Sequence, residues 1–247
     1  MKIIISPTKK MVVDNDSFTY DKLPKFLDKS KIILDVLLSK TYNELKNVWN
    51  CSDKLTQLNY DILQNASLEK NLTPAIFSYD GLVFQNIKPS IFTSEELNYC
   101  NNHLRILSGL YGLLCPFDGI TPYRLEMQAK LNTTDINSLY DFWGDSIANE
   151  LFAQTDTIIN LASVEYSKCV SRYANDYIKF ITCSFVEYKK GKLIEQATKA
   201  KIARGTMVKY IIENKLTQVN DLKSFNLLGY KYSEEHSTFD KFIFIKK

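Results

Sequence analysis

The chain has 247 residues, a formal net charge of +3 and a pI near 8.4, and 45% of its residues are hydrophobic. This length suits one large globular domain or two small ones, and the composition excludes a disordered chain. The charge is only weakly basic, short of the pI above about 9 at which composition alone indicates a nucleic-acid-binding protein. No stretch approaches the roughly 20 apolar residues that cross a bilayer, so we expect no membrane partner.

The cysteine pattern indicates reduced thiols. The five cysteines are odd in number, widely spaced and contain no C-x-x-C pair, namely Cys51, Cys100, Cys115, Cys169 and Cys183. The N-terminus has an apolar stretch of only three residues, too short for the apolar region of a signal peptide. We therefore expect a cytoplasmic protein without disulfides.

Helical and strand patterns alternate along the first half of the chain. A short buried strand is predicted at 2–6, rich in β-branched residues and closed by Pro7. Apolar residues recurring near the helical period predict three helices at 24–38, 41–49 and 52–63. Tyr79-Asp80-Gly81 indicates a turn between apolar arms, and the capping-box spacing at Thr93–Glu96 opens a further helix.

The second half continues the alternation. An amphipathic helix is predicted at 138–152, a strand at 157–161, a hairpin about Lys189-Lys190-Gly191, a long helix at 197–216 and a terminal strand at 239–245. No repeat or low-complexity linker interrupts the series. We therefore predict one α/β domain over residues 1–247, with a mixed sheet and surrounding helices.

Two of the eight glycines stand three positions apart in an apolar run, at Gly109 and Gly112. The segment 105–114 fits either a strand and turn or a helix–hairpin–helix. A turn of this kind between Arg105 and Arg124 could point backbone amides at a phosphate-sized anion. An isolated motif of this kind is also typical of a packing turn.

Several uncommon segments follow one another in a characteristic order. They are Ile5-Ser6-Pro7-Thr8-Lys9, Ser52-Asp53-Lys54-Leu55, the block from His103 to Leu114, Tyr140-Asp141-Phe142-Trp143-Gly144-Asp145, Ile159-Asn160-Leu161-Ala162-Ser163 and Ala203-Arg204-Gly205. In these segments the chain resembles the bacterial YaaA family of peroxide-stress proteins, over nearly its whole length. The resemblance implies a compact mixed α/β fold with a helix–hairpin–helix-like element. It also implies a role in limiting oxidative damage during peroxide stress.

The leading hypothesis is a cytoplasmic protein that binds DNA through its backbone, without base specificity. The residues expected to contact DNA or another anion are Lys9, Lys54, Arg105, Gly109, Tyr111, Gly112, Arg124, Lys168, Lys201, Arg204 and Lys209. Such binding should weaken steeply with salt, because phosphate contacts release counterions. Each lysine taken alone fits a solvated surface equally well, and the tyrosine fits a core position.

The competing hypothesis is an enzyme acting on a nucleotide or another small anionic substrate. Lys9 and Arg124 would then line a closed pocket, with Glu126 or Asp145 as the acid or base. A deep pocket would favour this alternative, and an open groove would favour DNA.

Cofactor and metal motifs are missing from the sequence. There is no Walker loop, no G-x-G-x-x-G and no H-E-x-x-H, and only two histidines accompany the scattered cysteines. We therefore expect no cofactor and no metal centre. A peroxide-sensing role for Cys115 would require a low thiol pKa, and no neighbouring basic residue in the sequence provides one.

Overall fold

An eight-stranded mixed sheet organises the computed structural model, which describes residues 1–14, 16–131 and 136–246. The strand order is β4-β3-β1-β6-β7-β10-β9, and β8 pairs with β7 outside this path. The buried apolar side chains of the described residues form one continuous core around the sheet. The predicted mixed α/β class with a mixed sheet is confirmed.

The middle of the sheet is parallel. Five neighbouring strands run in one direction, β3 (Leu104–Ser108), β1 (Lys2–Ile5), β6 (Thr157–Asn160), β7 (Lys179–Lys189) and β10 (Lys241–Lys246). Three short strands pair antiparallel to them, β4 (Gly112–Leu114), β8 (Lys192–Ile194) and β9 (Tyr230–Tyr232). A separate two-stranded ladder joins β2 (Thr73–Pro74) to β5 (Gly119–Ile120).

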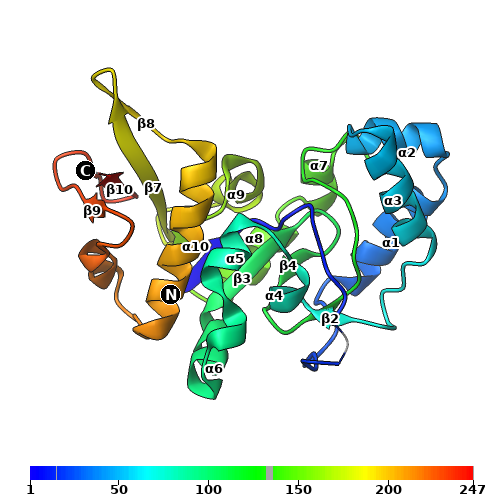
Figure 1. Cartoon of the computed structure of the whole chain (residues 1–247), viewed down its shortest axis with the longest axis horizontal. Helices are drawn as coiled ribbons and strands as arrows, with labels where there is room; N and C mark the ends of the chain where they lie inside the picture. Colours follow the sequence, from blue (N-terminus) through cyan, green and yellow to red (C-terminus); the bar gives the residue numbers. More distant parts are fainter. Residues whose placement is uncertain (15, 132–135, 247) are drawn as a thin grey trace.

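The helices fill the connections between the parallel strands (Figure 1). Between β1 and β3 lie α1 (Leu27–Leu38), α2 (Tyr42–Trp49), α3 (Asp53–Gln64), α4 (Ala75–Ser78), α5 (Leu82–Ile87), η1 (Pro89–Ile91) and α6 (Ser94–His103). Later in the chain come α7 (Leu139–Trp143), α8 (Ser146–Phe152), α9 (Val164–Ser171), α10 (Ala197–Glu213) and η2 (Val219–Ser224). Among these described helices, none is both long and apolar enough to cross a membrane.

Local signals place most of the helix starts correctly. Thr41 and Glu44 form a complete capping box at the start of α2, and Thr93 and Glu96 form another at α6. In each case the hydroxyl accepts an N–H of the first turn while the glutamate accepts the N–H of the capping residue. The predicted helices at 41–49 and after Thr93 are confirmed.

The segment 105–114 is a β-hairpin. β3 and β4 pair antiparallel, with Ile106 opposite Leu114 and Ser108 opposite Gly112. Gly112 has a φ of +72°, a left-handed conformation that favours glycine. The strand-and-turn alternative is therefore correct here, and the helix–hairpin–helix alternative is wrong for this segment.

A glycine also divides the single helix predicted at 138–152. The helix α7 ends at Trp143, Gly144 adopts a φ of +51°, and α8 starts at Ser146. Glycine adopts a positive φ at little cost, so the chain leaves the helical conformation at Gly144, and two short helices replace the predicted single one.

The mid-helix glycine of α10 marks a close helix contact. A Cβ built on Gly205 would lie 2.2 Å from the carbonyl oxygen of Val83 in α5. The absence of a side chain therefore allows α10 to pack backbone to backbone against α5.

We expect Gly112→Ala to destabilise the protein by about 2–4 kcal/mol, because it combines left-handed strain with steric overlap. A Cβ at this position would lie 2.7 Å from the Trp143 ring. The matched control is Gly191→Ala, which has a φ of +75° and no atom within 4 Å of the added Cβ. Urea unfolding of both variants measures the difference. Equal losses in the two would show that backbone strain alone matters.

The buried turn after β4 predicts a pH dependence of stability. Asp118 is 1% exposed, and burial raises its pKa from 3.8 to about 6. The folded state therefore binds the proton of the Asp118 carboxyl group more tightly than the unfolded chain does. Binding of this proton adds roughly 3 kcal/mol to the free energy of unfolding below pH 4, and this gain is lost as the pH rises through 6.

The comparison with Asp118→Asn isolates this effect, since all other titrating groups are shared. We expect the wild type to lose stability relative to the variant between pH 4 and pH 7 in urea titrations. A constant difference over that range would contradict the assignment.

Candidate functional site

A cavity of about 380 Å³ opens at the carboxyl ends of β1 and β6. The chain leaves β1 for β3 on one side and later returns to β6 on the other side of β1. Open α/β sheets bind ligands at such a reversal of strand order, beyond the carboxyl ends of the strands. The volume is at the lower end of the range of small-molecule pockets.

Two serines join the strand ends at the back of the cavity. Ser6 follows β1, and its Oγ accepts the backbone N–H of Ser163 at 2.8 Å. The two hydroxyl oxygens are 3.1 Å apart. Ser163 occupies the N-cap position of α9, but its hydroxyl pairs with Ser6 and does not cap the helix. The first turn of α9 and both hydroxyls therefore border the same space.

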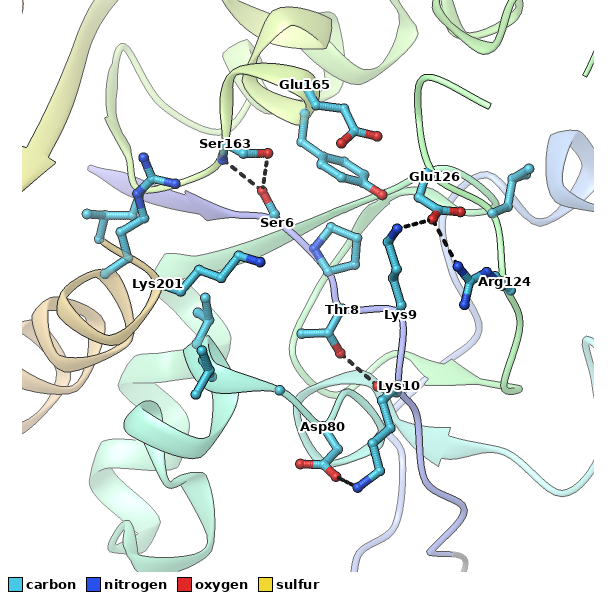
Figure 2. Close-up of a pocket in the computed structure, with 18 of the residues that line it drawn as sticks. Ser6, Thr8, Lys9, Lys10, Asp80, Arg124, Glu126, Ser163, Glu165 and Lys201 are labelled. Carbon is cyan, nitrogen blue, oxygen red and sulfur yellow. Dashed lines mark hydrogen bonds and ion pairs between the residues drawn. The ribbon is translucent and has the colours of Figure 1, made fainter. Parts of the chain in front are cut away.

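A charged cluster forms the opposite wall (Figure 2). Glu126 Oε1 lies 2.6 Å from Lys9 Nζ and 3.6 Å from Arg124 Nη2. The side chains of Arg124 and Glu126 are only 9% and 15% exposed. Arg124 Nε and Glu126 Oε2 are buried without a hydrogen-bond partner in the structure. Buried polar atoms of this kind are normally satisfied by water or a ligand.

The helix α10 brings two further cations to the cavity. Lys201 is exposed and reaches from α10 into the cavity in Figure 2. Arg204 Nη2 lies 2.8 Å from Glu195 Oε1, while Arg204 Nε is buried and unpaired. Of these two cations, Lys201 makes none of the ion pairs found among the described residues, so its charge is available to a ligand.

The N-terminal segment, with Thr8 and Lys10, closes the side of the cavity that lies at the bottom of Figure 2. Lys10 pairs with Asp80, and the backbone N–H of Asp80 donates to the Lys10 carbonyl at 2.9 Å. Gly81 permits this approach, because a Cβ there would lie 2.8 Å from the Thr8 methyl group. The turn predicted at Tyr79-Asp80-Gly81 therefore positions a wall of the cavity.

Tyr123 lines the cavity, and its hydroxyl belongs to a buried hydrogen-bond network. Its oxygen lies 2.6 Å from Ser108 Oγ and 2.8 Å from the Tyr79 hydroxyl. Burial raises the pKa of Tyr123 to about 12. The ring is thus held by a core network, and its hydroxyl remains protonated at neutral pH.

Glu165 is the second carboxylate facing the charged cluster. It stands in the first turn of α9, and its Oε1 accepts the N–H of Gln128 at 3.2 Å. Burial raises the pKa of Glu165 above its ordinary value, and the charge of Glu126 raises it further. The cavity therefore contains two carboxyl groups in unlike surroundings.

The fold gathers five of the sequence-predicted site residues around this cavity. They are Lys9, Arg124, Glu126, Lys201 and Arg204. They come from the N-terminal segment, the segment after β5, and α10. These residues lie far apart in the sequence, and the fold brings them together at the edge of the sheet where β1 and β6 end.

The glycine hairpin and its arginine lie elsewhere. Gly109, Tyr111 and Gly112 are buried, and Trp143 Nε1 donates to the Gly109 carbonyl at 3.0 Å. Arg105 is 7% exposed and donates to Gln154 Oε1 and to two backbone carbonyls. The hairpin is thus a packing element, and its amides and arginine do not form the anion site suggested by the sequence.

The remaining candidates do not line the cavity either. Lys54 is exposed on α3, and Asp145 is exposed before α8. Lys168 Nζ lies 5.3 Å from the centroid of the Tyr140 ring, and Lys209 pairs with Glu213 at 3.4 Å. Their contacts are those of ordinary surface side chains.

Cys115 does not have the surroundings of a reactive thiol. It is half-buried, and burial, with the charge of Asp118 next, raises its thiol pKa. A raised pKa lowers the fraction of thiolate, the form that reacts with peroxide. Within the described part of the chain, no group of three His, Cys, Asp or Glu residues could hold a metal ion.

Sequence reasoning missed the importance of three residues of the cavity. In the sequence, Ser6 and Ser163 belong to segments that carry the family resemblance, and Glu165 stands two residues after Ser163. Each lies at or just after the end of a predicted strand, which is the signal that could have grouped them.

Comparisons with known proteins match the chain over nearly its whole length. The family described as Peroxide stress protein YaaA matches residues 1–236. The chain is similar to a UPF0246 protein of Ligilactobacillus salivarius (strain UCC118), 52% identical over 246 residues and 100% of both chains. It is also similar to UPF0246 proteins of Agathobacter rectalis (44% identical, 100% of this chain and 99% of the relative) and Lachnoclostridium phytofermentans (45%, 100% and 96%).

Proposed function

This chain belongs to the peroxide stress protein YaaA family, and from that premise we propose that its cavity binds a phosphate-bearing nucleotide during the peroxide response. One observation carries the proposal. Hydroxyl and cationic groups converge at the reversal of strand order, where α/β sheets bind such ligands, and they come from four separate segments: the N-terminal segment, the segment after β5, the start of α9, and α10.

The anion is expected at the serine side of the cavity. Ser6 and Ser163 offer hydroxyls there, α9 begins beside them, and Lys201 has an available charge. Phosphate oxygens accept hydrogen bonds from such groups and are stabilised by the positive end of a helix.

The charge balance of the lining favours an anionic ligand. Lys9, Lys10, Arg124, Lys201 and Arg204 line the cavity with Asp80, Glu126 and Glu165, which leaves a surplus of two positive charges. A phosphate monoester carries a charge of about −1.5 to −2 at pH 7 and neutralises this surplus.

The apolar part of the lining suits the body of a nucleoside. Pro7, Leu82, Val83, Leu161 and Tyr166 separate the polar groups. Pockets for small ligands commonly combine such walls with a few convergent polar groups.

A second candidate is that the phosphate belongs to a DNA backbone. The side chains of Lys9 and Lys10 are 65% and 73% exposed at the rim of the cavity, where a strand could reach them. Under this proposal the cytoplasmic protein would contact DNA without base specificity and limit its oxidative damage. The buried glycine hairpin would take no part.

We expect Lys201→Ala to weaken nucleoside monophosphate binding by about 10- to 100-fold, the effect of losing one charge-assisted hydrogen bond. Lys209→Ala is the matched control, because Lys209 lies on the same helix but pairs with Glu213 away from the cavity. Calorimetric titration with adenosine, guanosine, cytidine and uridine monophosphates tests both variants. Equal affinities for wild type and Lys201→Ala would contradict an anion site at this lysine.

A salt series with duplex and single-stranded DNA tests the second candidate. We expect affinity to fall with salt, to fall further in a Lys9→Ala/Lys10→Ala variant, and to be competed by nucleoside monophosphate. Binding that the nucleotide does not displace would place DNA on another surface. No binding at low salt would exclude DNA as the partner.

A further inference from the structure

Two carboxyl groups share the cavity but have different electrostatic partners. Glu126 is held by Lys9 at 2.6 Å and by Arg124 at 3.6 Å. Glu165 lines the same cavity and makes none of the ion pairs found among the described residues, although it accepts the Gln128 N–H. Glu126 therefore has two cationic partners, whereas burial raises the pKa of Glu165.

Two carboxyl groups that share a cavity but differ in their surroundings are suited to paired acid and base catalysis. The ionised member can take a proton from water, and the other can give a proton to a leaving group. The raised pKa of Glu165, caused by burial and then by Glu126, agrees with the donor role. Tyr123 remains neutral and does not compete for either role.

The carboxylates also indicate which bond of a nucleotide is positioned for reaction. Enzymes that cleave a bond at an anomeric carbon commonly use a pair of carboxyl groups on either side of that bond. The reaction passes through an oxocarbenium-like state, whose positive charge a carboxylate stabilises. In a nucleotide the bond that breaks in this way is the N-glycosidic bond.

We propose that the protein hydrolyses the N-glycosidic bond of a nucleoside 5′-monophosphate, with Glu165 as the proton donor and Glu126 as the base. The proposal rests on nucleotide binding in the cavity, since the phosphate is held at the side of the cavity formed by Ser6, Ser163 and Lys201. It places the sugar carbon between the two carboxyl groups. Glu165 was not among the catalytic candidates from the sequence.

The step is a hydrolysis that requires only water. The water oxygen bonds to the anomeric carbon as the carbon–nitrogen bond breaks. Glu126 takes one proton from the water, and the Glu165 carboxyl group gives its proton to the departing nitrogen. The products are the free base and a pentose 5-phosphate, and proton exchange with solvent restores both carboxyl groups.

The test incubates the full chain with the ribose and deoxyribose 5′-monophosphates of each base and measures free base by chromatography. We expect base and pentose phosphate in equal amounts, and little release from nucleosides that lack the phosphate. Glu126→Gln and Glu165→Gln should each lower the turnover number by at least about 100-fold, with nucleotide affinity changed by less than about threefold. Glu213→Gln, on α10 outside the cavity, is the control for removing a carboxylate.

A second substrate separates the two roles. A ribosyl 5-phosphate with a nitrophenolate leaving group departs without a proton, so Glu165→Gln should cleave it at nearly the wild-type rate. Glu126→Gln should remain impaired on this substrate. With the natural nucleotide, wild-type turnover should fall as the pH rises through the pKa of Glu165, because the donor then loses its proton.

The outcomes distinguish this proposal from nucleotide binding itself. Calorimetric binding without release of any base would overturn hydrolysis and leave the binding proposal standing. Neither binding nor release would overturn both. Release that Glu165→Gln leaves unchanged, in a variant with wild-type circular dichroism, would overturn the donor assignment.

Discussion

The parallel pairing of β1 with β3 on one side and β6 on the other is the constraint on which the site depends. Ile3 is in register with Leu104 and with Ile159, so all three strands end at nearly the same level. The N–H of Leu161 continues the ladder by donating to the Ile4 carbonyl at 2.9 Å. Residues that follow these strands must therefore emerge together, which is why Ser6 and Ser163 meet across 157 positions of sequence.

Close backbone contacts then bring the charged segments to that edge. Gly81 allows the N-terminal segment to lie against the start of α5, and Gly205 allows α10 to pack against the other side of α5. Lys9 and Lys201 consequently face one cavity from opposite directions (Figure 2). A side chain at either glycine would separate these walls, since the added atom would lie within 3 Å of its neighbours.

Electrostatic pairing decides which cations remain available to a ligand. Most of the positive charge on α10 is compensated, because Lys199 pairs with Glu187, Arg204 with Glu195 and Lys209 with Glu213. Most of the positive charges of α10 are therefore neutralised by ion pairs, and Lys201 is the cation of this helix without one among the described residues. The helix does not present a continuous cationic stripe. This distribution favours recognition of a single phosphate over attraction to a long polyanion.

The sequence by itself determined the class of fold, the main helices and strands, and the family. Apolar periodicity and capping boxes act over a few residues, and they were sufficient for the helices that start after Thr41 and Thr93. The same local information left the segment 105–114 ambiguous and joined α7 to α8, because the pattern of apolar residues does not reveal the positive φ that Gly112 and Gly144 adopt. The tertiary structure alone decided the site. It separated Lys9, Arg124, Glu126, Lys201 and Arg204 from the other candidates and added Glu165, since burial and ion pairing depend on contacts between segments far apart in the chain.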